Sequence, residues 1–179
     1  MTTTTEMLAF WLTPAPRERA FFASIIRELA ARFDAPAFEP HITLVGGIVN
    51  DDRTLHVFRT LPVAPSYQLK IEGTFSATKY TKTFFIRFHL SDELRELRSS
   101  IAQALDLESE DDFDPHLSLL YKKMPLSERK ELGTSVKIPF QRVSFEGFKL
   151  MAHPPKITTR AEVEIWREIE CRRLTNAPD

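Results

Sequence analysis

Two short segments of the chain carry the same pattern of residues able to do acid–base chemistry. Residues 38–45 read Phe-Glu-Pro-His-Ile-Thr-Leu-Val, and residues 113–120 read Phe-Asp-Pro-His-Leu-Ser-Leu-Leu. Each copy places an imidazole two residues before a hydroxyl, His41 before Thr43 and His116 before Ser118. Side chains two positions apart on a strand point to the same face. Each copy therefore predicts a strand with one polar and one apolar face.

Brought together across a cleft, these four side chains could cleave a phosphodiester. One imidazole can take a proton from water while the other, protonated, gives a proton to the leaving oxygen, because the unperturbed pKa of histidine is about 6.5. The two hydroxyls can donate hydrogen bonds to the non-bridging phosphate oxygens, where charge concentrates. This chemistry requires no metal and no cofactor. The pattern predicts a catalytic set of four residues: His41, Thr43, His116 and Ser118.

Two other interpretations of these residues were weighed. A single His-x-Thr strand is most often structural, but two matching copies favour a shared site. A metal site is the second alternative, because Asp111, Asp112 and Asp114 lie near His116. Asp114 is separated from His116 by a proline and corresponds to Glu39 in the first copy, so we interpret these acids as a solvated turn. The remaining histidines lack a repeated context and are interpreted as ordinary ones: His56, His89 and His153.

The elements that must position the two motifs are mixed. Periodicity and turn signals predict further strands at residues 7–13, 67–77, 83–90, 139–151 and 163–174, and helices at residues 17–33, 51–60, 91–105 and 127–132. Interspersed strands and helices of this kind predict an α+β fold with antiparallel sheets. The 75-residue offset between the motifs is too long for a solenoid repeat. It predicts two similar lobes within a single domain spanning residues 1–179.

Composition excludes several classes of protein. The chain has 179 residues and a formal charge of −1, which argues against a protein that coats long nucleic acid. The single cysteine, Cys171, allows neither an internal disulfide nor a thiolate zinc site. The apolar stretches are too short to cross a membrane, and residues 1–6 do not read as a signal peptide. We expect a soluble, cytoplasmic monomer whose partner is a small molecule.

The paired motifs resemble those of the two-histidine (2H) phosphoesterase superfamily, and most closely the plant- and yeast-type cyclic phosphodiesterases. The similarity extends to residues 8–12 and 163–168. It implies a bilobal fold in which two antiparallel β-sheets, related by a pseudo-twofold and flanked by helices, enclose a central cleft. It also implies metal-independent hydrolysis of 2′,3′-cyclic nucleotides to 2′-phosphates, and of ADP-ribose 1″,2″-cyclic phosphate to ADP-ribose 1″-phosphate. The resemblance assigns His116 to activate water and His41 to protonate the leaving 3′-oxygen.

The resemblance, together with the aromatic and basic residues of the chain, also suggests contacts to the substrate. Tyr121, three residues after Ser118, is implied as a substrate contact. Trp11 and Phe84 could each stack a nucleobase, worth about 1–3 kcal/mol, or could equally be core aromatics. Four lysines could attract a second phosphate or could simply be solvated: Lys79, Lys82, Lys122 and Lys123.

Two alternative functions remain at this point. One is an RNA-end 2′,3′-cyclic phosphodiesterase or 2′-5′ RNA ligase-like protein, which the absence of a basic stripe disfavours. The other is a non-catalytic module that binds cyclic phosphates, which the presence of all four polar groups disfavours.

Overall fold

The computed structural model describes residues 6–108 and 112–174. Strands and helices alternate along the chain in the order β1 (Met7–Pro14), α1 (Pro16–Phe33), β2 (Ile42–Val49), α2 (Asp52–Thr60), β3 (Tyr67–Ser76), the 3₁₀ turn η1 (Tyr80–Lys82), β4 (Phe84–Phe88), α3 (Asp92–Ala104), β5 (His116–Leu120), α4 (Leu126–Ser135), β6 (Arg142–His153), α5 (Arg160–Glu164) and β7 (Arg167–Arg173). The α+β class predicted from the sequence is confirmed.

The strands pair antiparallel throughout, in the order β2-β1-β6-β3-β4-β5, and β7 pairs with β6. The two predicted sheets share a strand. Residues 67–70 of β3 pair with β6, and residues 71–76 pair with β4. The first half of β3 therefore belongs to one lobe and the second half to the other. The two motif strands, β2 and β5, lie at opposite ends of this strand order and approach each other in space.

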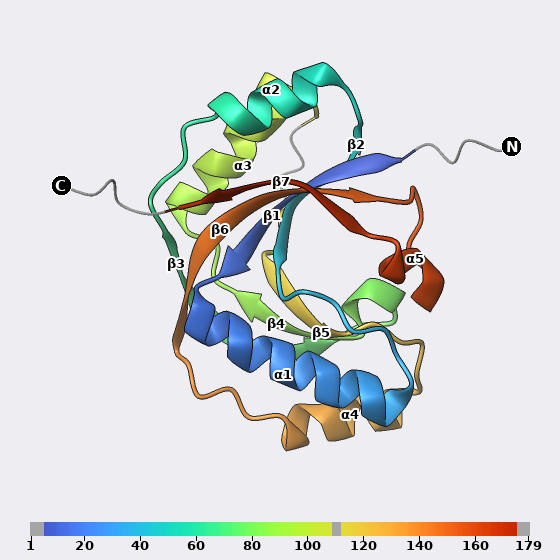
Figure 1. Ribbon diagram of the computed structural model, residues 1–179. Helices are drawn as coiled ribbons and strands as arrows, with labels where there is room; N and C mark the ends of the chain where they lie inside the picture. The colour runs from blue at the N-terminus through green and yellow to red at the C-terminus, as the bar shows by residue number, and fades with distance from the viewer. Residues whose placement is uncertain (1–5, 109–111, 175–179) are drawn as a thin grey trace, which may run out of the picture.

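The helices cover the outer faces of the strands (Figure 1). Helices α2 and α3 lie together on one side of the molecule, and α1 and α4 lie on the other. Helix α1 packs against β5 and β1, whereas α3 packs against β2. Helix α1, which precedes the first motif, therefore packs on the strand of the second motif, and α3, which precedes the second motif, packs on the strand of the first. The two halves of the chain share one core as a result.

The hydrophobic core explains why these segments adopt their elements. Helix α1 buries Phe22, Ile26 and Leu29, a 3.6-residue periodicity typical of an amphipathic helix. Where α2 packs on the sheet, the ring of Phe58 stacks on the ring of Phe148 of β6, with 4.8 Å between the ring centroids. Full burial of each large apolar side chain contributes about 1.5–3 kcal/mol, so these contacts fix the strands that carry the motifs.

The last predicted strand is partly wrong. Residues 163 and 164 belong to α5, and β7 begins only at residue 167. The hydroxyl of Thr159 accepts a hydrogen bond from the backbone N–H of Glu162. The carboxylate of Glu162 in turn accepts one from the backbone N–H of Thr159. This capping box starts a helical turn, and it overrides the strand-like composition of the segment.

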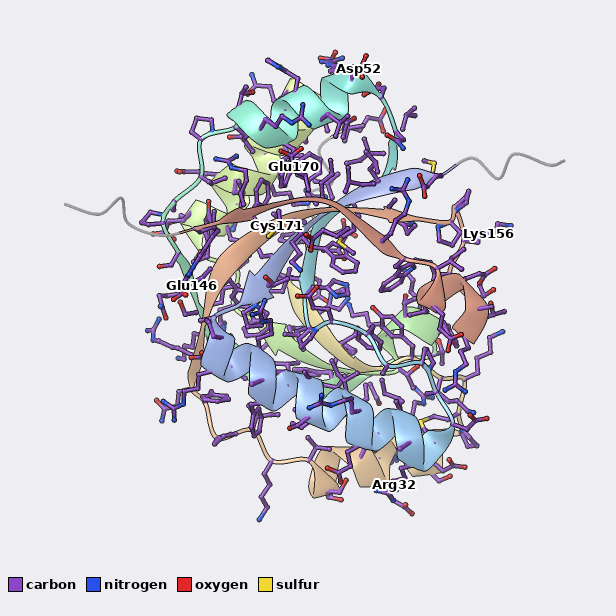
Figure 2. The ribbon with its side chains drawn as sticks, in the orientation of Figure 1. Arg32, Asp52, Glu146, Lys156, Glu170 and Cys171 are labelled. Atoms are coloured by element: carbon purple, nitrogen blue, oxygen red, sulfur yellow. The ribbon has the colours of Figure 1, made fainter. Side chains whose placement is uncertain are left out.

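Within residues 6–108 and 112–174, no helix is long and apolar enough to cross a membrane. In those ranges no three His, Cys, Asp or Glu side chains are grouped so that they could hold a metal ion. Asp111, one of the acids considered for a metal, lies outside the described residues. Cys171 lies exposed on β7 (Figure 2).

Candidate active site

The four polar groups of the two motifs line one cavity of about 690 Å³. On β2 and the residue before it, His41 and Thr43 face this cavity, while Ile42 and Leu44 are buried in the hydrophobic core. On β5, His116 and Ser118 face the cavity, and Leu117 and Leu119 enter the core. The alternation expected for each motif is present.

Each motif histidine is held by the carbonyl two residues before it. The Nδ1 of His41 lies 2.7 Å from the Glu39 oxygen, and the Nδ1 of His116 lies 2.8 Å from the Asp114 oxygen. A carbonyl can only accept, so Nδ1 carries the proton in both rings. Nε2 is therefore the nitrogen left for proton transfer. The acidic residue of each acid-Pro-His segment supplies this carbonyl, which explains why both copies of the repeat share the segment.

Burial lowers the pKa of both imidazoles. His41 is 6% exposed, and its burial lowers the pKa to about 3, against the raising effect of its bond to the Glu39 carbonyl. The charge of His116 also lowers the pKa of His41, so the two rings are near enough to interact. The pKa of His116 is lowered by burial as well, and by the charges of Lys82 and Lys79, against the raising effects of the Asp114 carbonyl and carboxylate. Both shifts favour the neutral form of the ring at pH 7.

An aromatic ring lies against each motif histidine. Trp11 on β1 is opposite Thr43 of β2, and its indole stacks on the His41 ring at 3.5 Å with 6° between the planes. In the second lobe, Phe85 on β4 is opposite Ser118 of β5 and meets the His116 ring edge-on at 5.5 Å. The two lobes therefore place equivalent aromatics beside equivalent histidines.

Phe84, predicted as a possible substrate contact, belongs to the core. It is 1% exposed, packs in the hydrophobic cluster and does not line the cavity. Phe85, its neighbour, points to the histidine side instead. Adjacent side chains of a strand point to opposite faces, so of the two alternatives given for Phe84 the structure shows the core aromatic. Trp11 does line the cavity but is 3% exposed, since His41 covers it.

The second hydroxyl belongs to a small hydrogen-bond network. Ser118 donates to the carbonyl of Thr81 in η1 at 2.8 Å. The Tyr121 hydroxyl is hydrogen-bonded to the Ser118 side chain, and burial raises the pKa of this phenol, so Tyr121 stays protonated. Tyr121 lines the cavity, where the resemblance placed it. The ring of Phe38 stacks on Tyr121 at 3.9 Å and fixes its plane.

Trp166 lines the cavity without having been predicted as a site residue. Its indole meets the rings of Trp11, His41 and Tyr121 nearly edge-on, at 5.3, 5.9 and 5.9 Å. Trp166 lies between α5 and β7. The sequence signal was present, because Trp166 falls in the segment 163–168 that resembles the superfamily.

The charged rim differs from the sequence prediction in part. Lys79, Lys82 and Arg98 line the cavity together with Asp114. Lys82 forms an ion pair with Asp114. The other two lysines considered for a second phosphate are not among the lining residues: Lys122 donates to the Asp34 carbonyl, and Lys123 is exposed.

Of the three histidines interpreted as ordinary, two are exposed and one is at the cavity. His56 and His89 are exposed. His153 lines the cavity, and its Nδ1 lies 2.8 Å from the carbonyl of Pro154. No sequence signal marks this position, because His153 has no counterpart in a repeated motif. Two of the acids interpreted as a solvated turn, Asp112 and Asp114, line the cavity, as does Glu108.

Comparison with known proteins decides the family. The model of the cyclic phosphodiesterase-like protein family matches residues 7–171, which include both motifs and Trp166. The chain belongs to this family. Its membership confirms the 2H phosphoesterase resemblance and an enzyme of the phosphodiesterase class. A cyclic phosphodiesterase of Arabidopsis thaliana is 21% identical over 127 residues, which cover 70% of each chain.

Solved structures share the fold. A crystal structure of Escherichia coli LigT complexed with 3′-AMP superposes with a TM-score of 0.59, at 16% identity, over 96% of this chain and 99% of the other. LigT complexed with phosphate gives a TM-score of 0.58 at 15% identity, over 96% and 98% of the two chains. At this identity, the similarity establishes the architecture of this cyclic phosphodiesterase-like protein.

Proposed function

We propose that this enzyme hydrolyses 2′,3′-cyclic phosphates of nucleosides to 2′-phosphates, without a metal ion. ADP-ribose 1″,2″-cyclic phosphate, opened to ADP-ribose 1″-phosphate, is the second substrate that we propose. The observation that carries the proposal is the matched geometry of His41 and His116, each with Nδ1 bound to a carbonyl and Nε2 left for chemistry in one cavity. The relative in Arabidopsis thaliana is named a cyclic phosphodiesterase.

The reaction requires one imidazole in each protonation state. Nε2 of the neutral histidine accepts a proton from water as the water oxygen bonds to phosphorus. The bond from phosphorus to the 3′-oxygen breaks, and Nε2–H of the protonated histidine gives its proton to that oxygen. Thr43 donates a hydrogen bond to one non-bridging oxygen, and Ser118 donates to the other once its hydroxyl turns from the Thr81 carbonyl. Charge builds up on these oxygens in the transition state. A substrate phosphate also favours the protonated form of the neighbouring imidazole.

The lining of the cavity suits a nucleotide-sized ligand. Trp166 is half-buried and presents aromatic surface to the cavity, and base–aromatic stacking contributes about 1–3 kcal/mol without reading the base edge. Lys79 and Arg98 supply positive charge on the rim for a second phosphate, as ADP-ribose would carry. We therefore expect weak discrimination among bases.

The test is hydrolysis of a nucleoside 2′,3′-cyclic phosphate in excess EDTA, with the product identified by phosphorus NMR. We expect turnover that survives chelation and yields only the 2′-phosphate. His41→Ala and His116→Ala should each lower kcat by at least about 100-fold, and His56→Ala, an exposed control, should leave it unchanged. Activity lost on chelation, or a 3′-phosphate product, would contradict the proposal.

An RNA-end phosphodiesterase or ligase-like function is the second candidate, because LigT shares the fold over 96% of this chain. Comparison of kcat/KM for a mononucleotide and for an oligonucleotide ending in a cyclic phosphate separates the two. A large preference for the oligonucleotide would favour this candidate. Tight binding of either ligand with no product over long incubation would instead indicate a non-catalytic binding module.

A further inference from the structure

The acidic residue of each acid-Pro-His repeat has two functions in the structure. Its backbone carbonyl holds the motif histidine, while its carboxylate binds a lysine and an arginine. Glu39 lies 2.8 Å from Lys149 of β6 and 3.7 Å from Arg19 of α1. Asp114 forms its ion pairs with Lys82 of η1 and, at 2.9 Å, with Arg87 of β4. The same arrangement thus recurs in both lobes, with partners drawn from unrelated segments.

We propose that Glu39 and Asp114 are positioning residues of the phosphodiesterase reaction, and that Lys149 and Lys82 act through them. This inference rests on the catalytic role proposed above for the two histidines. Each ion pair fixes the acid-Pro turn, so that its carbonyl faces Nδ1 and the imidazole presents Nε2 to the substrate.

The local chain geometry supports this role. A residue that precedes proline is restricted to extended backbone conformations, so Glu39 and Asp114 have few ways to orient their carbonyls. The ion pair selects one of these. With the carbonyl in place, Nδ1–H is bound and the neutral ring is held in a single tautomer. Without it, the ring can rotate or place its proton on Nε2, which removes the acceptor needed for water activation.

The first copy gives the cleaner test, because Lys149 does not line the cavity. Its side chain is 12% exposed and is shared between Glu39 and, at 2.7 Å, Glu168 of β7. Lys82 and Asp114, in contrast, are part of the cavity wall and could contact substrate directly. Replacement of Glu39 leaves Lys149 paired with Glu168, so no buried charge is left alone and the fold should persist.

The variants Glu39→Gln and Lys149→Met test the proposal, and Glu168→Gln is the matched control. The control removes one carboxylate from the same lysine but has no link to a histidine. We expect Glu39→Gln and Lys149→Met each to lower kcat about 10-fold with KM changed less than twofold, because a misplaced catalytic group mainly affects the transition state. The double variant should lose no more than the single ones, and Glu168→Gln should keep the wild-type kcat.

Nitrogen-15 NMR of His41 supplies a readout that needs no substrate. In the wild type and in Glu168→Gln, the neutral ring should be the Nδ1–H tautomer, and in Glu39→Gln a mixture should appear. A folded Glu39→Gln protein with wild-type kcat and an unchanged tautomer would overturn the proposal, as would a change in KM alone. Because the tautomer is measured on the free enzyme, a failure of the proposed substrate does not affect this arm.

Discussion

The imidazole of His41 lies parallel to the indole of Trp11, with 3.5 Å between ring centroids and 6° between planes. This contact covers the surface that Trp11 would otherwise offer to a nucleobase and leaves the indole 3% exposed. The stack therefore acts on the histidine: it helps to bury His41, and burial is the largest cause of its lowered pKa. Base stacking is left to other rings of the cavity.

Replacement of Trp11 by leucine should raise the pKa of His41 toward 6.5. The smaller side chain lets water reach the ring, and hydration favours the charged form. Titration of the His41 ring protons by NMR measures the shift. Phe85→Leu is the matched control, because Phe85 lies beside His116 at the equivalent position of the other lobe, edge-on instead of stacked. That variant should shift His116 and leave His41 unchanged. A His41 titration curve that is the same in wild type and Trp11→Leu would show that the stack does not set this pKa.

The stability of the protein should fall as the pH falls below 6.5. The folded pKa of His41 is about 3, against 6.5 for the free side chain, so between these values the unfolded state binds more protons than the folded one. Stability is therefore full above 6.5 and is lost toward pH 3, by up to about 1.4 kcal/mol per pH unit for one proton. The lowered pKa of His116 adds in the same direction.

Urea denaturation between pH 4.5 and 7.5 measures this dependence. His41→Asn keeps an N–H donor for the Glu39 carbonyl but does not titrate, so its free energy of unfolding should change less steeply with pH than that of the wild type. His56→Asn, at an exposed position, should retain the wild-type slope. Equal slopes for the wild type and His41→Asn would mean that the folded protein does not keep His41 neutral.

The motif alternation shows which part of the site the sequence could predict. Imidazole and hydroxyl two residues apart define a strand face by local geometry alone, and His41, Thr43, His116 and Ser118 share the cavity. The choice between Phe84 and Phe85 could not be made in this way. Both are aromatic and adjacent, and only the pairing of Phe85 with Ser118 across β4 and β5 decides which one faces the histidine.

Trp166 and the shared strand β3 depend on tertiary contacts. Trp166 reaches the cavity because α5 turns the chain just before β7. The strand predicted over residues 163–174 does not take account of the capping box of Thr159 and Glu162 that starts α5. The change of partner in β3 between residues 70 and 71 leaves no local pattern, since it reflects which strands arrive on either side. Long-range pairing of this kind is not encoded in a short window of sequence.

The roles of the two histidines can be separated with a better leaving group. Resemblance implies that His116 activates water, but burial lowers the pKa of His41 to about 3. His116 is only half-buried, and its pKa is lowered as well. The difference in burial favours His116 as the group that holds a proton and His41 as the base. A cyclic phosphate with sulfur in place of the 3′-oxygen leaves as a thiolate and needs little protonation. We expect this substrate to restore much of the activity of His116→Ala and little of that of His41→Ala. The opposite pattern would support the assignment implied by resemblance.

Gly147 on β6 should be required by its contact with Thr13 on β1. The two residues are cross-strand partners, and a Cβ at position 147 would lie 2.1 Å from the Thr13 Oγ1. Thr13 is buried, and its hydroxyl has no hydrogen-bond partner in the part of the chain that the structure describes. Gly147→Ala should therefore lower the free energy of unfolding by about 1–3 kcal/mol through overpacking, and the change should be visible as a lower Tm.

Thr13→Ala in the same protein should recover most of that loss, because it removes the clashing oxygen and an unpaired buried hydroxyl. A double-mutant cycle measures this coupling. Gly133→Ala in helix α4, where an added Cβ meets nothing within 4 Å, is the control and should be neutral or stabilising by about 0.5–1 kcal/mol. Additive effects of Gly147→Ala and Thr13→Ala on the free energy of unfolding would show that the two strands can separate without cost.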